Sequence, residues 1–97
     1  MTDAVLRAYL LIRQQRWEMA ENELRLALAR DGQDAEAHSL LALCLVQRER
    51  YEEAEGQARI AIGLAPDDGS VFRTLAIVLA ERRKYRESQA AVTRSIE

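Results

Sequence analysis

The stretch RERYEEAE at residues 48–55 occurs in the chain in three related forms. The chain reads QQRWEMAE 34 residues earlier, at residues 14–21, and RRKYRESQ 34 residues later, at residues 82–89. Self-similarity at a fixed period of this length is typical of repeat proteins. The sequence therefore divides into three repeat units, residues 1–34, 35–68 and 69–97, in which residues 34 apart occupy equivalent positions.

Equivalent positions in the three units keep the same size of side chain, with no insertion between them. The small positions are Ala8, Ala42 and Ala76; Ala20, Ala54 and Ser88; and Ala27, Ala61 and Ser95. The large positions are Leu11, Leu45 and Leu79; Leu28, Ile62 and Ile96; and Trp17, Tyr51 and Tyr85. A Leu- and Ala-rich helix could match by chance at one or two positions, but not at all of them. The repeat is therefore real.

The middle unit predicts a pair of helices. Residues 35–48 and 52–64 both carry apolar side chains at helical spacing, and only a short polar joint separates them. Helices joined so tightly lie antiparallel, and Ala or Ser at the facing positions lets their backbones approach to about 8–10 Å. Pro66 ends the second helix, because proline has no N–H and restricts the residue before it. Gly32 occupies the same position in the first unit, where we expect a left-handed conformation.

The period, the small positions, the aromatic residue after the joint and the proline at the end of the unit resemble the tetratricopeptide repeat family. The resemblance covers nearly the whole chain and implies one all-α domain, residues 1–97, built as a right-handed superhelix of three stacked helix-turn-helix hairpins. The chain departs from the family pattern at Gln15, Glu49 and Arg83, where the family has glycine in the joint. It also carries no further capping helix after the third unit. We therefore expect additional chain or a neighbouring molecule to cover that end.

Composition and motifs argue against catalysis. A net charge of −2 provides no general attraction to nucleic acid or anionic lipid. His38 and Cys44 are the only histidine and cysteine, and both fall at packing positions of the predicted helices. We therefore predict a non-enzyme with no metal site, no cofactor and no reactive thiol. The apolar run at residues 5–12 is too short to span a membrane, and we expect a reducing, cytoplasmic location.

The family resemblance implies a partner-binding groove along the first helices of the units. Its centre is apolar and its rim polar, which favours capture of a helix or an extended peptide. We expect the groove to consist of Val5, Tyr9, Ile12, Arg13, Ser39, Leu43, Val46, Gln47, Arg73, Ile77 and Glu81. The predicted function is that of a protein-binding scaffold or adaptor. Because bacterial members of the family often serve as assembly factors or secretion chaperones, the resemblance implies such a role as a more specific possibility.

Two other functions remain open from the sequence. The joints are rich in cations, which would form an Arg-rich edge able to bind RNA, although matching of helix dipoles explains the same charges. The edge consists of Arg13, Arg16, Arg48, Arg50, Arg82, Arg83, Lys84 and Arg86. Alternatively, the chain is an architectural array that self-associates through its N-terminal or C-terminal end. Apolar residues surround the first helix almost completely, which favours a partner or a second copy at the N-terminal end.

Overall fold

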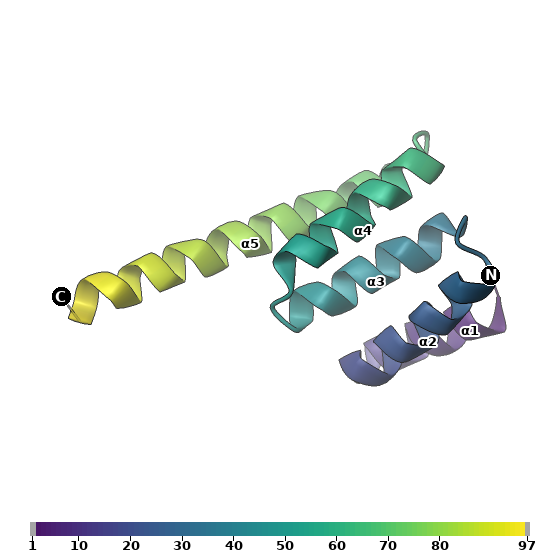
Figure 1. Cartoon of the computed structure of the whole chain (residues 1–97), viewed down its shortest axis with the longest axis horizontal. Coiled ribbons are helices and arrows are strands. Elements are labelled where there is room, and N and C mark those ends of the chain that lie inside the picture. The colour runs from purple at the N-terminus through teal and green to yellow at the C-terminus, as the bar shows by residue number, and fades with distance from the viewer. Residues whose placement is uncertain (1, 97) are drawn as a thin grey trace.

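Five α-helices joined by short loops make up the part of the chain that the structure describes (Figure 1). The computed structural model describes residues 2–96, but not the side chains of residue 92 and of residues 94–96. The helices are α1 (Asp3–Arg13), α2 (Trp17–Arg30), α3 (Ala35–Gln47), α4 (Tyr51–Leu64) and α5 (Gly69–Ile96). The described residues contain no strand, and the predicted all-α class is confirmed.

Two helical hairpins, α1–α2 and α3–α4, stack on each other and on the first half of α5. The second helix of each hairpin packs between two first helices: α2 between α1 and α3, and α4 between α3 and α5. The small positions predicted from the repeat lie in these contacts, where Ala8, Ala20, Ala42 and Ala54 are fully buried. Their short side chains let the backbones of neighbouring helices approach closely. The large side chains of Leu24, Leu41 and Leu45, which are also fully buried, fill the space beside these contacts.

The joints of the first two units have the same backbone conformation. Gln15 has a φ of 60° and Glu49 a φ of 62°, the left-handed region that the family pattern reserves for glycine. In the first joint the N–H of Arg16 donates to the carbonyl of Leu11 at 2.9 Å, and that of Gln15 to Ile12 at 2.9 Å. These are the two hydrogen bonds of a Schellman motif, which ends a helix and reverses the chain. Hydrogen bonds of this kind hold a residue other than glycine in the left-handed conformation, which costs such a residue about 1 kcal/mol or more relative to glycine.

The second helices end as the sequence predicts in one unit and differently in the other. The helix α4 ends at Leu64, and Ala65, the residue before Pro66, has a non-helical backbone with φ −138° and ψ 65°. The left-handed conformation expected at Gly32 is wrong, because no glycine has a positive φ. Instead, α2 ends where Asp31 becomes extended, with φ −144° and ψ 94°.

The third unit is not a hairpin, which corrects the prediction of three hairpins. Residues 69–96 form one continuous helix, and Arg83, which is equivalent to Gln15 and Glu49, lies within it. Figure 1 shows the second half of α5 extending past the loop between α3 and α4. As a result, Phe72 and Leu79 are 48% and 41% exposed, whereas the equivalent residues His38 and Leu45 are buried, and His38 contacts Gln57 on α4.

The continuous helix has a physical reason. In the first two units the cost of a left-handed joint is offset because the second helix packs against two first helices. In this structure a folded-back segment 85–96 would pack against only one, the first half of α5. It would also place the hydroxyl of Ser88 where the other units bury Ala20 and Ala54. With less apolar area to bury, a straight helix that keeps its backbone hydrogen bonds is favoured.

Candidate functional site

A hollow of about 430 Å³ lies along the side of the molecule formed by α1, α3 and α5. Its apolar part contains Tyr9, Leu43 and Ile77, which are equivalent residues of the three units. Tyr9 and Ile77 are 44% and 41% exposed, so the hollow is accessible apolar surface rather than core. We call this hollow the α1–α3–α5 groove; its lining is Tyr9, Glu36, Ser39, Leu40, Leu43, Asp68, Ser70, Val71, Arg73, Thr74 and Ile77.

A buried pair of hydroxyl groups forms part of the groove floor. Ser39 on α3 donates to Oγ1 of Thr74 on α5 at 2.7 Å, and Thr74 donates to the carbonyl of Ser70 at 3.2 Å. Both side chains are buried with their hydrogen-bonding groups satisfied. The bond therefore fixes α3 against α5 at the point where the groove crosses from one helix to the other.

The groove rim is charged at the start of α5. Asp68 accepts hydrogen bonds from the backbone N–H of Ser70 at 2.9 Å and from its hydroxyl at 2.8 Å. These bonds, with a smaller contribution from the charge of Arg73, lower the pKa of Asp68 below its ordinary value. Asp68 and the exposed Glu36 thus add negative charge to a rim that also carries the cation of Arg73.

The structure brings together part of the residue set predicted for the groove. Tyr9, Ser39, Leu43, Arg73 and Ile77 line one hollow, although Ser39 is buried in its floor. The other six predicted residues lie outside this hollow: Val5, Ile12, Arg13, Val46, Gln47 and Glu81.

Two of these six positions need correction. Val5 and Val46 are 0% and 4% exposed and belong to the hydrophobic core, so they cannot present a side chain to a partner. The reason is that α3 packs against both α1 and α5, and the positions between these helices are covered. The remaining four are at least partly exposed, and their part in partner binding stays a prediction.

Six lining residues are outside the predicted set: Glu36, Leu40, Asp68, Ser70, Val71 and Thr74. Asp68 had a signal, since an aspartate just before a helix is a typical N-cap, and the equivalent Asp34 caps α3 with Oδ1 accepting from the N–H of Ala37 at 3.1 Å. Thr74 had a weaker signal, because it stands where the second unit has Leu40. A polar residue at an otherwise apolar position indicates a specific hydrogen bond.

Carboxylates neutralise much of the Arg-rich edge. Arg48 and Arg50 bond to Glu21 at 2.7 and 3.1 Å, and Arg82 bonds to Glu55 at 2.8 Å. Further along α5, Arg83 pairs with Glu87 and Lys84 with Glu81. Arg48, Arg50 and Arg82 therefore connect neighbouring helices, while the other two pairs lie within α5. RNA binding at this edge is not the function that the geometry favours.

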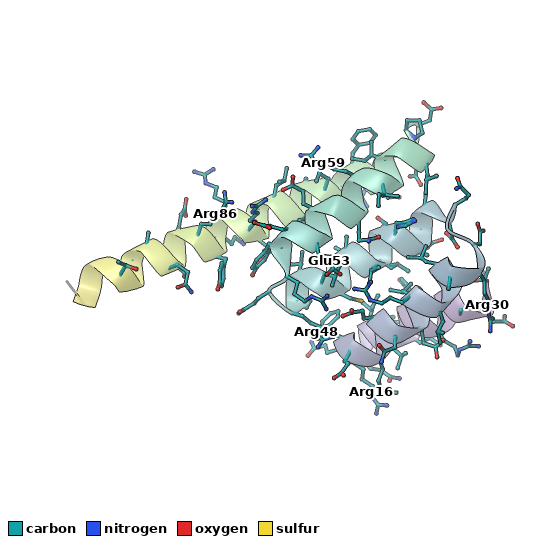
Figure 2. All side chains as sticks on the ribbon, in the orientation of Figure 1. Arg16, Arg30, Arg48, Glu53, Arg59 and Arg86 are labelled. Atoms are coloured by element: carbon teal, nitrogen blue, oxygen red, sulfur yellow. The ribbon has the colours of Figure 1, made fainter. Side chains whose placement is uncertain are left out.

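Three cations of the edge have no ion pair among the side chains that the structure describes: Arg13, Arg16 and Arg86. Figure 2 shows Arg16 beside α2 and Arg86 on the projecting half of α5, at separate places on the molecule. Scattered single cations do not make the continuous basic surface that a nucleic acid backbone requires.

The most buried of these carboxylates is Glu21. Burial alone would raise the pKa of Glu21, but hydrogen bonds and charge from Arg25, with contributions from Arg50 and Arg48, lower it below the ordinary value of 4.5. Arg25 also bonds to Glu53, which in turn accepts from Arg50 at 2.6 Å. Perturbed acids of this kind occur at active sites, but here an ion-pair network between two repeat units accounts for the shift.

The single histidine and cysteine are parts of the packing. His38 is buried, with Nδ1 2.6 Å from Oε1 of Gln57 on α4 and Nε2 2.9 Å from the carbonyl of Gly32. Both ring nitrogens therefore lie within hydrogen-bonding distance of an oxygen of a neighbouring residue. Cys44 is fully buried, and this burial raises the pKa of its thiol to about 12. The prediction that both residues serve structure is confirmed.

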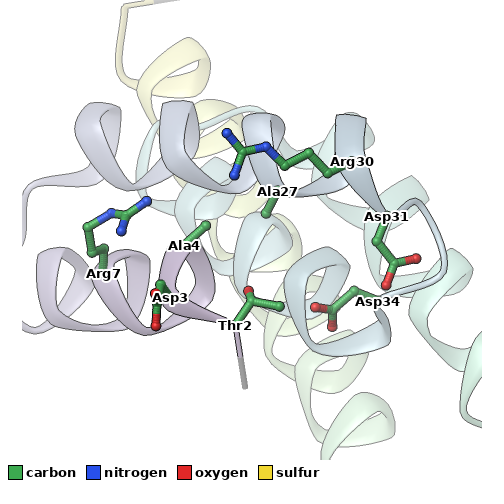
Figure 3. A pocket seen from close by; sticks show the side chains of 8 residues that line it. All are labelled: Thr2, Asp3, Ala4, Arg7, Ala27, Arg30, Asp31 and Asp34. Atoms are coloured by element: carbon green, nitrogen blue, oxygen red, sulfur yellow. The ribbon is translucent and has the colours of Figure 1, made fainter.

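A separate hollow of about 320 Å³ lies between the start of α1 and the end of α2. Figure 3 shows Arg7 and Asp3 toward one end of it and Arg30, Asp31 and Asp34 toward the other. Two of the three carboxylates already serve the loop: Asp31 accepts from the N–H of Gln33 at 3.0 Å, and Asp34 caps α3. Because its lining carries charges of both signs, and because Asp31 and Asp34 already bond to the backbone nearby, the hollow has no clear preference for an ion.

Two further findings concern the described part of the chain. No group of three or more histidine, cysteine, aspartate or glutamate side chains there is arranged to hold a metal ion. No helix there has both the length and the apolar character needed to cross a membrane.

Antiparallel helix pairs that stack at a period of 34 residues define a helical repeat protein. The tetratricopeptide repeat family matches residues 5–69, and the chain therefore belongs to that family. Proteins of this family are typically non-catalytic and generally mediate protein–protein interactions. No curated protein shows significant similarity to the chain.

Proposed function

We propose that the chain is a protein-binding scaffold that captures a helix or an extended peptide in the α1–α3–α5 groove. The observation that carries the proposal is the convergence of Tyr9, Leu43 and Ile77, from three different helices, on one accessible hollow. Exposed apolar side chains gathered in a groove and rimmed by polar groups are typical of peptide-binding sites. The function needs no catalytic group, since binding alone brings the partner to the scaffold.

The groove also suggests the chemistry of its partner. Apolar side chains of the partner would lie on Tyr9, Leu43 and Ile77, where burial provides most of the affinity. A basic residue of the partner would lie beside Glu36 and Asp68, and an acidic one beside Arg73. An assembly factor or a chaperone would use such a groove to hold a client segment, and we propose that role as the more specific form of the function.

The first step of the test is to identify the partner through the groove itself. A photo-reactive amino acid at Leu43, introduced into the full chain in cells, would cross-link a segment lying on the groove. The same amino acid at Leu26, which is exposed on α2 outside the groove, is the matched control. We expect a partner segment that cross-links from position 43 and not from position 26.

Binding of that segment is then measured with the purified chain. Ile77→Glu places a charge in the apolar part of the groove and should weaken binding at least about tenfold, because an anchor pocket typically contributes more than 1 kcal/mol. Leu26→Glu should leave the affinity unchanged. If Ile77→Glu binds the segment as tightly as the unchanged chain, or if no segment cross-links from position 43, the proposed function is wrong.

A further inference from the structure

The α1–α3–α5 groove has an acidic end and an apolar end. Its lining on α3 extends from Glu36, in the first turn, to Leu43, and its lining on α5 extends from Ser70 to Ile77. The first and last residues are seven positions apart on both helices, which corresponds to two turns or about 10 Å. A segment bound along the groove would therefore meet charge and apolar surface about 10 Å apart.

Five carboxylates lie where α3 and α5 begin. Figure 1 shows the α2–α3 loop and the α4–α5 loop at the same end of the stacked helices, opposite the α3–α4 loop. The carboxylates belong to these two loops and to the first turn of α3: Asp31, Asp34, Glu36, Asp67 and Asp68. None of the five forms an ion pair with a side chain that the structure describes.

The charges at the opposite end of the helices are arranged differently. There, Arg48 and Arg50 bond to the carboxylate of Glu21 at 2.7 and 3.1 Å, and Arg82 bonds to that of Glu55 at 2.8 Å. Carboxylate and guanidinium charges so close together offset each other. The carboxylates at the acidic end of the groove have no such direct partners, so their charge acts outward.

Cations and helix dipoles compensate only part of this negative charge. Arg30 lies toward the same end of the hollow in Figure 3 as Asp31 and Asp34, and Arg73 lies close enough to Asp68 to help lower its pKa. The starts of α3 and α5 each add about half a positive charge, so an excess of about two negative charges remains. The lowered pKa of Asp68 keeps this carboxyl ionised at neutral pH.

Two of the five carboxylates line the groove itself and are accessible to a bound segment. Glu36 and Asp68 are both exposed. Asp68 holds Ser70 through Oδ1 alone, and its other oxygen, Oδ2, accepts no hydrogen bond from the described residues. A lysine or arginine in the groove could therefore donate to Oδ2 of Asp68 and to Glu36, while the remaining carboxylates attract it from outside the groove.

We propose that the groove selects a segment in which a lysine or arginine lies about 10 Å from a large apolar side chain. The cation lies against Glu36 and Asp68, and the apolar side chain lies against Leu43 and Ile77. The inference rests on the proposed function, and it makes the cation a requirement for binding. An extended chain advances about 3.3 Å per residue and a helix 1.5 Å, so the two side chains are about three residues apart in an extended segment and about seven apart in a helix.

The test selects binding peptides from a displayed library of random sequences, with the full chain as the target. Peptides that bind in the groove are those that Ile77→Glu no longer retains. We expect these peptides to share a lysine or arginine at the stated spacing from a large apolar residue. If they share no cation, the inference is overturned and the proposed function stands. If no selected peptide depends on Ile77, both are overturned.

Charge reversal measures the contribution of the cation, with one of the selected peptides as the ligand. Glu36→Lys should raise the dissociation constant at least roughly threefold, and the difference should decrease at high salt. The matched control is Glu18→Lys, the same change in the first turn of α2, which lies outside the groove and should leave the dissociation constant unchanged. Circular dichroism confirms that both variants are folded.

Two results of this measurement would overturn the proposal. One is a Glu36→Lys variant that binds the peptide as tightly as Glu18→Lys does. The other is an affinity that depends on acidic residues of the peptide and is lost in Arg73→Glu but not in Glu36→Lys. In both cases a peptide that still depends on Ile77 would leave the proposed function intact.

Discussion

The guanidinium of Arg48 donates to the carboxylate of Glu21 at 2.7 Å, across the boundary between the first two repeat units. The same carboxylate is bonded by Arg25 at 2.8 Å and by Arg50 at 3.1 Å. One buried acid therefore connects α2 with the joint between α3 and α4. This contact fixes how the two hairpins stack, in addition to the apolar core between them.

We predict that Glu21→Gln lowers the free energy of unfolding by about 1–3 kcal/mol, because a buried site loses several charge-assisted hydrogen bonds. Urea unfolding at neutral pH measures the change. The matched control is Glu87→Gln, which removes an exposed pair with Arg83 on α5. That pair should contribute less than about 0.5 kcal/mol. Equal effects of the two substitutions would contradict the role assigned to Glu21.

The stability of the protein should decrease in acid. The pKa values of Glu21, Glu53 and Glu55 all lie below the ordinary value of 4.5. For Glu53 and Glu55 the main cause is a hydrogen bond, from Arg25 and from Arg59 respectively. A carboxyl whose pKa is lower in the folded state contributes stability that is fully present above the unfolded pKa and is lost as the pH falls through the folded pKa.

We therefore expect the urea midpoint to be nearly constant between about pH 6 and pH 7 and to fall below about pH 4.5. Glu21→Gln should make this decrease shallower, since one of the three titrating groups is removed. A midpoint that rises on acidification from pH 5 to pH 3 would show that the ion pairs do not contribute to folding stability.

Much of the fold follows from the sequence because the first two units place the same kinds of side chain at equivalent positions. Ala20 and Ala54 must be small, and Pro66 must end a helix, in any packing of this chain. The third unit could not be predicted in the same way. Its residues resemble those of the other units. Whether the chain reverses at Arg83 or continues as a helix depends on how many helices the following segment can pack against. The residues of the third unit do not reveal how many such helices there are.

The groove was predicted less completely than the fold. The apolar positions Tyr9, Leu43 and Ile77 follow from helical spacing and share one hollow. Val5 and Val46 lie at the same spacing on the same side, and are nevertheless buried. Exposure here depends on the distance between α1, α3 and α5, which is set by packing of the whole molecule rather than by the residues of one helix.

The thiol of Cys44 should be unreactive in the native protein. Burial raises its pKa from 9.0 to about 12, which reduces the thiolate roughly a thousandfold at a given pH. We predict that a disulfide reagent at pH 8 modifies the folded chain only at the rate of transient unfolding, and modifies the chain in urea at once. A fast reaction of the folded protein, without loss of helical circular dichroism, would contradict the burial of this residue.

The close approach of helices at Ala54 can be tested by introducing a larger side chain at this position. Ala54 is fully buried between helices, so Ala54→Arg introduces both excess volume and a buried charge. It should lower the free energy of unfolding by about 3 kcal/mol or more. Ser88→Arg, at the equivalent but exposed position on α5, should change it by less than about 0.5 kcal/mol. If both variants unfold at the same urea concentration as the unchanged chain, the predicted nesting of the helices is wrong.

Glycine at the joint positions should have opposite effects in the second and third units. Glu49 has a φ of 62°, so Glu49→Gly removes a strained conformation and should raise the free energy of unfolding by about 0.5–1 kcal/mol. Arg83 occupies the equivalent position inside the continuous helix α5, where Arg83→Gly should lower helix content and cost about 1 kcal/mol. Circular dichroism and urea unfolding measure both. If Arg83→Gly instead stabilised the protein as Glu49→Gly does, the chain would have to reverse at position 83, and residues 69–96 would not form the single helix α5.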